Sequence, residues 1–465
     1  MRLTRRQVLV GAATSGLGAV GLYELVDRVA SSERVRRAAG RFHSEQHLLD
    51  GLAVEQDNGV AVVIPPLHHA VVTAHVVTED LRGAQRELED TLTELERRYP
   101  PTPAGLGVTV AWGLPYFRRF VPQQADVHIP VDRRASGKAG RTVRALAHAI
   151  RFPSDPKGML LERNDVAVLL RSDVRENIED AERALFRGSR ILRATSIRRG
   201  FVGSDFRAGP SLAKRMAQEA RIDGADLIPD DAELFLGFTS TQQAALGPRK
   251  IANFETLGYV DLGPTAYFRN GTHMHVSHVF EDLASWYQTF DFQERVDTVF
   301  KPGVKVKSGT VTVSEAGPDA ASAADVLDDF HRDGRIGHSS SIQSASRLVR
   351  DVVAPDGTVY KRGTAIPQRA DFNTLDNPFA WSSKPERDTM QESPAAGLHF
   401  VVFNPTSDDF HRNRLAMDGV LPDGSRLKFG VRDRKQGFNA VLSTTHRQNF
   451  IVPPRRHRSF PLAEL

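Results

Sequence analysis

Residues 70–95, AVVTAHVVTEDLRGAQRELEDTLTEL, decide the fold class of this chain. The first eight residues are rich in β-branched side chains, which is typical of a strand. Thr78-Glu79-Asp80 is a helix-capping sequence, and the leucines that follow it return to one face of a helix. A strand followed at once by an amphipathic helix predicts a mixed α and β fold.

Similar patterns recur along both halves of the chain. We expect strands at 107–113, 166–170, 193–202, 273–279 and 398–403, helices at 173–186, 283–290 and 408–417, and a loop-rich segment at 302–368. Strand–helix–strand units that occur twice predict an α+β protein with two ferredoxin-like domains, in which antiparallel sheets are covered by helices.

The predicted domain organisation has five parts. Residues 1–30 form a signal and 31–50 an N-terminal extension. The first ferredoxin-like domain spans 51–207 and the second spans 232–465, with a linker at 208–231 between them. A chain of this length is expected to bury a sizeable core in two domains.

Residues 1–30 have the features of an export signal. Thr4-Arg5-Arg6-Gln7-Val8-Leu9 resembles a twin-arginine motif, and a weakly apolar run rich in glycine and alanine follows it. This run falls short of the about 20 apolar residues that a membrane-spanning helix needs. We expect the twin-arginine translocase to export the folded protein to the cell envelope or the extracellular space. The leader is either cleaved a little after Ala30 or retained uncut, because the cleavage signal at 29–31 is weak.

Composition excludes several classes of function. The formal net charge of +4 is too small to favour a nucleic-acid partner. The chain has no cysteine, which excludes disulfides, iron–sulfur clusters, thiolate-ligated haem and a cysteine nucleophile. The sequence does not predict the oligomeric state.

Several segments resemble the dye-decolourising peroxidase family of haem enzymes. Residues 271–295, which begin GTHMHV and end in Gln-Glu-Arg, are similar to a strand and helix of that family. Residues 397–410, beginning GLHFVVFN, are similar to its terminal strand and helix, and 59–66 to its opening. The shared order of these segments covers about residues 50–455. The resemblance implies the two-domain ferredoxin-like fold, haem b as cofactor, hydrogen peroxide as oxidant and an unidentified reducing substrate.

The resemblance also implies that His338 is the haem-iron ligand. The proximal ligand of the family is a single histidine, and Arg335-Ile336-Gly337-His338-Ser339 matches its position. A neutral imidazole can hold the iron on one side and leave the other side open for peroxide. His331 is the nearest competing histidine, and a loop histidine without any ligand role is the other interpretation.

On the peroxide side of the haem the chain departs from the family pattern. The family carries Gly-x-x-Asp-Gly, whose aspartate is its acid–base group, and the matching stretch 237–241 has Ser240 instead. Loss of a positioned acid–base group typically lowers a rate by about 10²–10⁴-fold. The distal arginine of the family matches Gln368 in direct register, and a shift of one residue brings Arg369 to that place. Two functions therefore remain open: a weakened haem peroxidase-like oxidoreductase, and a non-catalytic haem-binding or structural module.

Other polar clusters are given structural interpretations. The run HMHVSH at 273–278 has ligand-compatible spacing, but it overlaps a predicted strand, and a packing role is favoured over a metal. His68-His69 is interpreted as a solvated turn. The pair Arg198-Arg199 and the cluster at 455–458 are interpreted as solvated surface charge.

Overall fold

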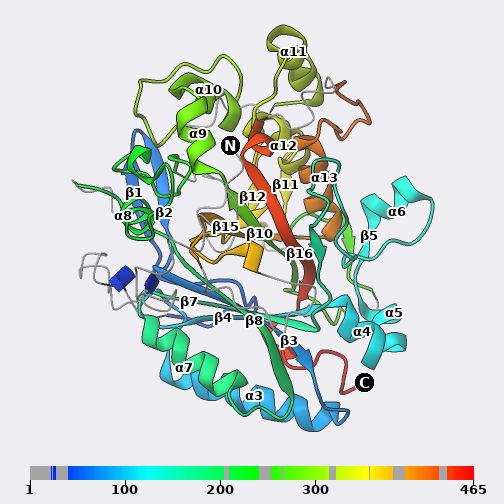
Figure 1. Ribbon diagram of the computed structural model, residues 1–465. Coiled ribbons are helices and arrows are strands. Elements are labelled where there is room, and N and C mark those ends of the chain that lie inside the picture. Colours follow the sequence, from blue (N-terminus) through cyan, green and yellow to red (C-terminus); the bar gives the residue numbers. More distant parts are fainter. Residues whose placement is uncertain are drawn as a thin grey trace.

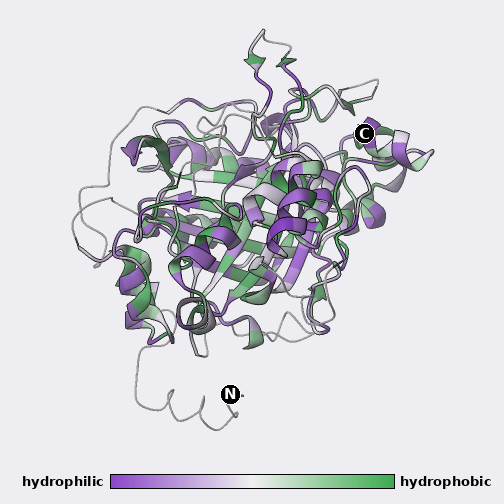
Figure 2. Cartoon of the chain, turned by 90° about the horizontal axis from the view of Figure 1, so that it is seen from above, coloured by the Kyte–Doolittle hydropathy of each residue, from purple (hydrophilic) through white to green (hydrophobic). Residues whose placement is uncertain are grey.

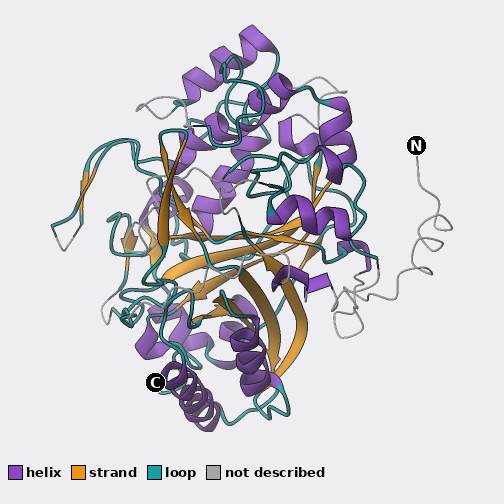
Figure 3. Cartoon of the chain, turned by 90° about the vertical axis from the view of Figure 1, so that its left-hand side faces the viewer, coloured by secondary structure: helices purple, strands orange, loops and turns teal. Residues whose placement is uncertain are grey.

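The computed structural model places its strands in the centre of the molecule, with helices above and below them (Figure 1). Figure 3 shows the same layering from the side, with orange strands between two groups of purple helices. Among the described residues, no helix combines the length and the apolar character needed to cross a membrane. The structure describes residues 22–23, 25–27, 40–203, 209–239, 253–263, 266–313, 321–354, 357–380, 393–428 and 437–465.

The first half of the chain forms a four-stranded antiparallel sheet. Its strands lie in the spatial order β8-β3-β7-β4. A long connection at 114–165 joins the second and third strands, and helices connect the first to the second and the third to the fourth, so this is a ferredoxin-like βαββαβ unit with an insertion. Its elements are β3 (His68–Val76), α3 (Leu81–Arg98), β4 (Gly107–Gly113), β7 (Val166–Ser172), α7 (Arg175–Phe186) and β8 (Leu192–Phe201).

Helices α3 and α7 lie side by side below this sheet (Figure 1). The Asp80 side chain accepts a hydrogen bond from the Gly83 amide and so caps the start of α3. Leu88, Leu92 and Leu95 on one face of α3 are at most 2% exposed. The leucine spacing of the sequence thus becomes the buried face of the helix.

The second half repeats the same arrangement. Its sheet has the order β16-β10-β15-β14, and the short strand β13 pairs with the other end of β15. Its elements are β10 (Thr272–Glu281), α9 (Leu283–Thr289), α10 (Phe292–Val299), α11 (Ala323–Asp333), α12 (His338–Ser346), β13 (Gln368–Arg369), β14 (Phe372–Thr374), β15 (Gly397–Asn404), α13 (Ser407–Met417) and β16 (Leu442–Val452).

The two sheets join into one closed ring of strands. One seam is the single pair Asn373–Phe201 between β14 and β8. The other seam, between β16 and β4, consists of the pairs Phe450–Gly113 and Ile451–Trp112. Inward-facing side chains of both sheets meet in an apolar cluster within the ring. Figure 2 shows hydrophobic strand segments near the centre and hydrophilic residues on the surrounding helices.

Smaller elements connect and flank the two units. They are β1 (Ala53–Asp57), β2 (Val60–Ile64), α4 (Leu114–Phe120), α5 (Pro122–His128), β5 (Val131–Asp132), α6 (Arg133–Ala139), β6 (Leu160–Leu161), α8 (Leu212–Glu219), β9 (Val260–Asp261), β11 (Val352–Val353), β12 (Val359–Tyr360) and the 3-10 turns at 225–227, 378–380, 437–440 and 455–457. Helix α8 and the turn at 225–227 lie within the segment predicted as a linker.

The predicted fold class, α+β with two ferredoxin-like sheets covered by helices, is confirmed. The predicted strands and helices match observed elements to within two residues at each end. The loop-rich interpretation of 302–368 is wrong, because α11 and α12 lie there. Ser322 and Asp325 form a capping box at the start of α11, a signal that the sequence contains.

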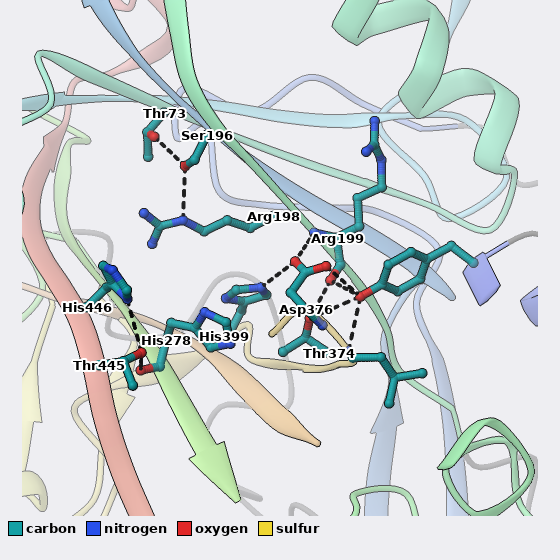
Figure 4. A network of polar contacts seen from close by, with 12 residues as sticks. Thr73, Ser196, Arg198, Arg199, His278, Thr374, Asp376, His399, Thr445 and His446 are labelled. Atoms are coloured by element: carbon teal, nitrogen blue, oxygen red, sulfur yellow. Dashed lines mark hydrogen bonds and ion pairs between the residues drawn. The ribbon is translucent and has the colours of Figure 1, made fainter. Parts of the chain in front are cut away.

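Two further interpretations of polar residues are wrong, and one of these residues, Arg198, belongs to a polar network inside the ring. Arg198 is wholly buried and forms an ion pair with Glu162, so it is not solvated surface charge. His68 is 4% exposed and lies in β3, not in a solvated turn. Figure 4 shows the centre of the network, where His399 Nε2 lies 3.1 Å from Asp376 Oδ2. The rings of His278 and His399 are 4.3 Å apart.

Candidate functional site

A cavity lies between the outer face of the second sheet and the helices that cover it. The cavity has a volume of about 230 Å³. This approaches the lower end of the range of about 300–1,000 Å³ that is typical of small-molecule and cofactor pockets.

Alternation along the strands decides which side chains form the cavity floor. Ser277, Val279 and Glu281 of β10 line it, together with alternate residues of β15. Met274 and Val276 point to the opposite face and pack inside the ring. The remaining walls are mostly apolar and include Phe238, Phe300, Ile342, Phe400, Phe410, Met417 and Phe438.

His338 is the first residue of α12 and lines the cavity. The preceding Gly337 lies so close to Phe300 that a Cβ atom would come within 2.3 Å of the Phe300 carbonyl oxygen. The Ser340 amide donates to the same carbonyl at 2.9 Å. These two contacts fix the start of the helix, so the site position of His338 depends on a glycine that no other residue can replace without displacement.

The imidazole of His338 is available as a ligand. Its ring packs against Phe438 at 4.7 Å, and its Nδ1 atom has no hydrogen-bond partner among the described residues. Burial, with the positive charges of Arg369 and Arg414, lowers the pKa of His338 to about 3. The ring is therefore neutral at neutral pH, which is the form that binds a transition metal.

The structure distinguishes Gln368 from Arg369, the two residues that match the position of the distal arginine in the resembled family. Arg369 pairs with Val402 in β15, and both line the cavity. Gln368 pairs with Phe403, whose side chain packs inside the ring. Because neighbouring residues of a strand point to opposite faces, Arg369 faces the cavity and Gln368 faces away from it.

Ser240 lies outside the described residues. The segment that leads to it does line the cavity, through Leu234, Leu236, Phe238 and Thr239. Helix α9 holds this segment, because Trp286 Nε1 donates to the Leu236 carbonyl at 2.9 Å and the Tyr287 hydroxyl donates to the Phe235 carbonyl at 2.7 Å.

Three more arginines reach the cavity wall. Arg414 is bonded to Asp418 at 2.8 Å and Arg447 to Asp155 at 2.6 Å, so nearby carboxylates balance their charges. Burial lowers the pKa of both Arg447 and Arg347 to about 10, and the charge of Arg369 also acts on Arg347. Two positive charges that repel each other in a cavity favour the binding of an anionic group there.

Glu281 and Asp371 also line the cavity, and sequence reasoning missed both of them. Glu281 ends β10 directly before the helix cap Asp282, so a charge at this position resembles ordinary helix capping. Asp371 lies two residues beyond Arg369 and shares its strand parity, which is the signal that could have identified it.

The histidine run at 273–278 is not a metal site among the described residues. His275 Nδ1 lies 2.7 Å from Asn449 Oδ1, and its ring stacks on Phe410. No group of three or more histidine, cysteine, aspartate or glutamate residues is placed to hold a metal ion in the part of the chain that the structure describes. His331 is exposed in α11 and does not line the cavity.

Comparison with solved structures found similar chains among dye-decolourising peroxidases. The DyP-type peroxidase from Cellulomonas bogoriensis is 18% identical, with 89% of this chain and 96% of that chain covered and a TM-score of 0.48. The encapsulated DyP-type peroxidase from Mycobacterium smegmatis is 12% identical, with coverage of 85% and 95% and a TM-score of 0.48. The dye-decolorizing peroxidase from Bacteroides thetaiotaomicron is 10% identical, with coverage of 89% and 98% and a TM-score of 0.47.

Comparison of sequences gave a family but no curated relative. No curated protein matches the chain. A family model matches residues 66–454, which include both sheets and the cavity between the second sheet and its helices. The chain therefore belongs to DUF7405, a family of unknown function.

Proposed function

We propose that the protein is a haem-binding, peroxidase-like oxidoreductase with His338 as the iron ligand. The observation that carries the proposal is a neutral, partly buried imidazole that faces a largely apolar cavity and whose Nδ1 atom has no hydrogen-bond partner among the described residues. An imidazole with free ligand capacity at a small-molecule pocket is the arrangement that haem proteins use on the proximal side.

The residues of the cavity fit a haem. His338 would bind the iron, and the aromatic and aliphatic walls would pack against the flat porphyrin. Arg347, whose charge is opposed by that of Arg369, would receive an anionic group of the ligand. A bound haem would supply redox chemistry with hydrogen peroxide, and the protein would supply binding, orientation and charge. Arg369 is then the cation available to stabilise negative charge on a small oxygen ligand.

A non-catalytic haem-binding or structural module is the second candidate function. Ser240, in place of the acidic residue of the resembled motif, favours it. A serine hydroxyl is a poor general base at neutral pH unless a partner takes its proton.

One experiment separates the two candidates. The purified protein is titrated with haemin, its absorbance is recorded, and hydrogen peroxide is then added with an oxidisable dye. A Soret band with dye turnover supports the oxidoreductase. A Soret band without turnover supports the second candidate, and protein that shows no Soret band overturns both haem-binding proposals.

We also propose that the protein is exported by the twin-arginine translocase with its leader retained. The described part of the leader packs into the folded body, where Leu22, Tyr23 and Val26 are at most 6% exposed. The Tyr23 hydroxyl donates to Asp376 Oδ1 at 3.0 Å, and Asp27 lies 2.6 Å from His68 Nε2. These contacts favour retention over cleavage after Ala30.

Replacement of Tyr23 by Phe is expected to lower the free energy of unfolding by about 1–3 kcal/mol, because the buried Asp376 loses a hydrogen bond. Denaturant unfolding of the variant and the parent measures this. The matched control is Tyr99→Phe, which removes a partly exposed hydroxyl that donates to Asp180. An unchanged midpoint for Tyr23→Phe would contradict docking of the leader.

Export itself is tested with Arg5→Lys/Arg6→Lys, which should trap the protein in the cytoplasm. Mass spectrometry of exported parent protein should find residues 22–27 still attached. Secretion of the double variant would refute the twin-arginine route, and a mature terminus after Ala30 would refute retention.

A further inference from the structure

Glu281 is a buried acid that has no ion-pair partner among the described residues. It lies at the end of β10, is 3% exposed and lines the cavity. Its Oε2 atom has no hydrogen-bond partner among the described residues. A carboxylate in such a place is costly, since desolvation without a partner disfavours the charged form.

Burial and the nearby charge of Asp371 raise the pKa of Glu281 to about 8. The pKa of Asp371 is also raised by burial, but the charge of Arg369 acts in the opposite direction. Two carboxyls of one cavity thus have different environments, one kept as a neutral acid and the other beside a cation. Such a difference is typical of acid–base pairs.

The position of Glu281 relates it to the segment that precedes Ser240. Glu281 contributes to the raised pKa of Tyr287, so the two groups are close enough to interact. The Tyr287 hydroxyl holds the Phe235 carbonyl, and Leu234, Leu236 and Glu281 line the same cavity. Glu281 therefore lines the same cavity as Phe238 and Thr239, two described residues of the resembled acid–base motif.

We propose that Glu281 supplies to this cavity the proton-exchanging carboxyl that position 240 lacks. The inference rests on the proposed haem-dependent function and names the residue that moves the proton. The O–H bond of the Glu281 carboxyl breaks as an O–H bond forms on a water or an oxygen ligand in the same cavity, and the reverse transfer restores the acid. Atoms and charge balance in each direction without any further reactant.

The charged groups that face this carboxyl explain its state. The other titratable or charged side chains of the cavity wall are His338, Arg347, Arg369, Asp371, Arg414 and Arg447, and Tyr287 interacts with Glu281 from α9. Carboxylates balance Arg414 and Arg447, and His338 is neutral. Asp371 is the group whose charge acts on Glu281 directly.

Infrared spectroscopy of the protein without haem tests the protonation state. The difference spectrum between the parent and Glu281→Gln should contain one protonated-carboxyl band at pH 6.5, and that band should disappear as the pH rises through about 8. Asp371→Asn should move this loss to lower pH, because it removes the opposing charge. The control Glu87→Gln, on the exposed face of α3, should leave the band unchanged. If the Glu281→Gln difference spectrum lacks this band, the inference is overturned.

Rates with hydrogen peroxide test the role of the carboxyl. In haem-loaded protein, Glu281→Gln should keep the Soret band and react about 10²-fold or more slowly. If Glu281→Gln does not fold, Glu281→Asp should retain an infrared band and still react more slowly, because the acid is shorter. A parental rate in a haem-loaded, folded variant overturns the inference. If the parent lacks a Soret band, the proposed function itself fails, and that outcome is distinct.

Discussion

His338→Ala is expected to lose haem binding, with an affinity more than about 100-fold below that of the parent. Changes to groups that merely orient a metal ligand cost 10–100-fold, and this substitution removes the ligand itself. The chain has no cysteine that could replace it. Haemin titration followed by the Soret band measures the loss, and added imidazole should restore part of the band by filling the space left by the side chain.

The matched control is His331→Ala. His331 is exposed on α11, near His338 in sequence but outside the cavity, so its replacement should leave haem affinity unchanged. His338→Ala should unfold near the parental midpoint, because its neutral ring contacts Phe438 and makes no hydrogen bond through Nδ1. Full haem occupancy in His338→Ala would show that the ligand lies elsewhere.

Acidification below about pH 6.5 is expected to unfold the protein within about two pH units. Burial lowers the pKa of ten histidines, and the shift is large for nine of them, so each of the nine binds a proton in the unfolded chain at a pH where it stays neutral in the fold. Stability is therefore full above the ordinary histidine pKa and is lost as the pH falls. These residues are His47, His69, His273, His275, His278, His338, His399, His411 and His446.

The size of the effect follows from proton counting. Each such histidine removes up to about 1.4 kcal/mol per pH unit. Glu281 and Asp376, with pKa values raised to about 8 and about 7, act in the opposite direction, because they bind protons in the folded state. The pKa values of five further acids, Asp132, Glu182, Asp231, Glu255 and Asp371, are also raised. The nine histidines outnumber these seven acids, and their loss of stability on acidification is large beside a typical free energy of unfolding of about 5–15 kcal/mol.

Urea unfolding at pH 7.5, 6.5 and 5.5 measures this loss. His47→Gln should reduce the proton uptake on unfolding by about one, because its pKa is lowered to about 3. The exposed His331→Gln should leave the pH dependence unchanged. Equal midpoints at pH 7.5 and 5.5 would contradict the prediction.

The fold could be predicted because its signals are local. The β-branched run at 70–77 and the leucines that follow it specify a strand and a helix without reference to the rest of the chain. Helix α12 could not be predicted in this way, because HSSSIQSAS is poor in strong helix formers. It forms where Gly337 packs against the Phe300 carbonyl, a contact between residues distant in sequence.

The candidate site could likewise be predicted only in part. The family resemblance led to His338 and to the Gln368–Arg369 pair, and strand parity then decided which of the pair faces the cavity. Arg198 was misinterpreted because its partner Glu162 is brought to it by folding. Glu281 was missed for a related reason, because its raised pKa results from burial in the folded protein, and the sequence alone does not reveal that burial.

The closed ring also sets an order of events during synthesis. Strand β16 pairs with β10 of its own sheet and with β4 of the first sheet. The edges of β10 and β4 that face β16 therefore have no hydrogen-bonding partner strand until residues 442–452 have been synthesised. Until then, a nascent chain exposes unpaired strand edges and the apolar inner faces of two half-rings. Pairings between residues this far apart in sequence form slowly. The chain is therefore expected to depend on chaperones that shield it late in translation, with completion of the ring as the commitment step.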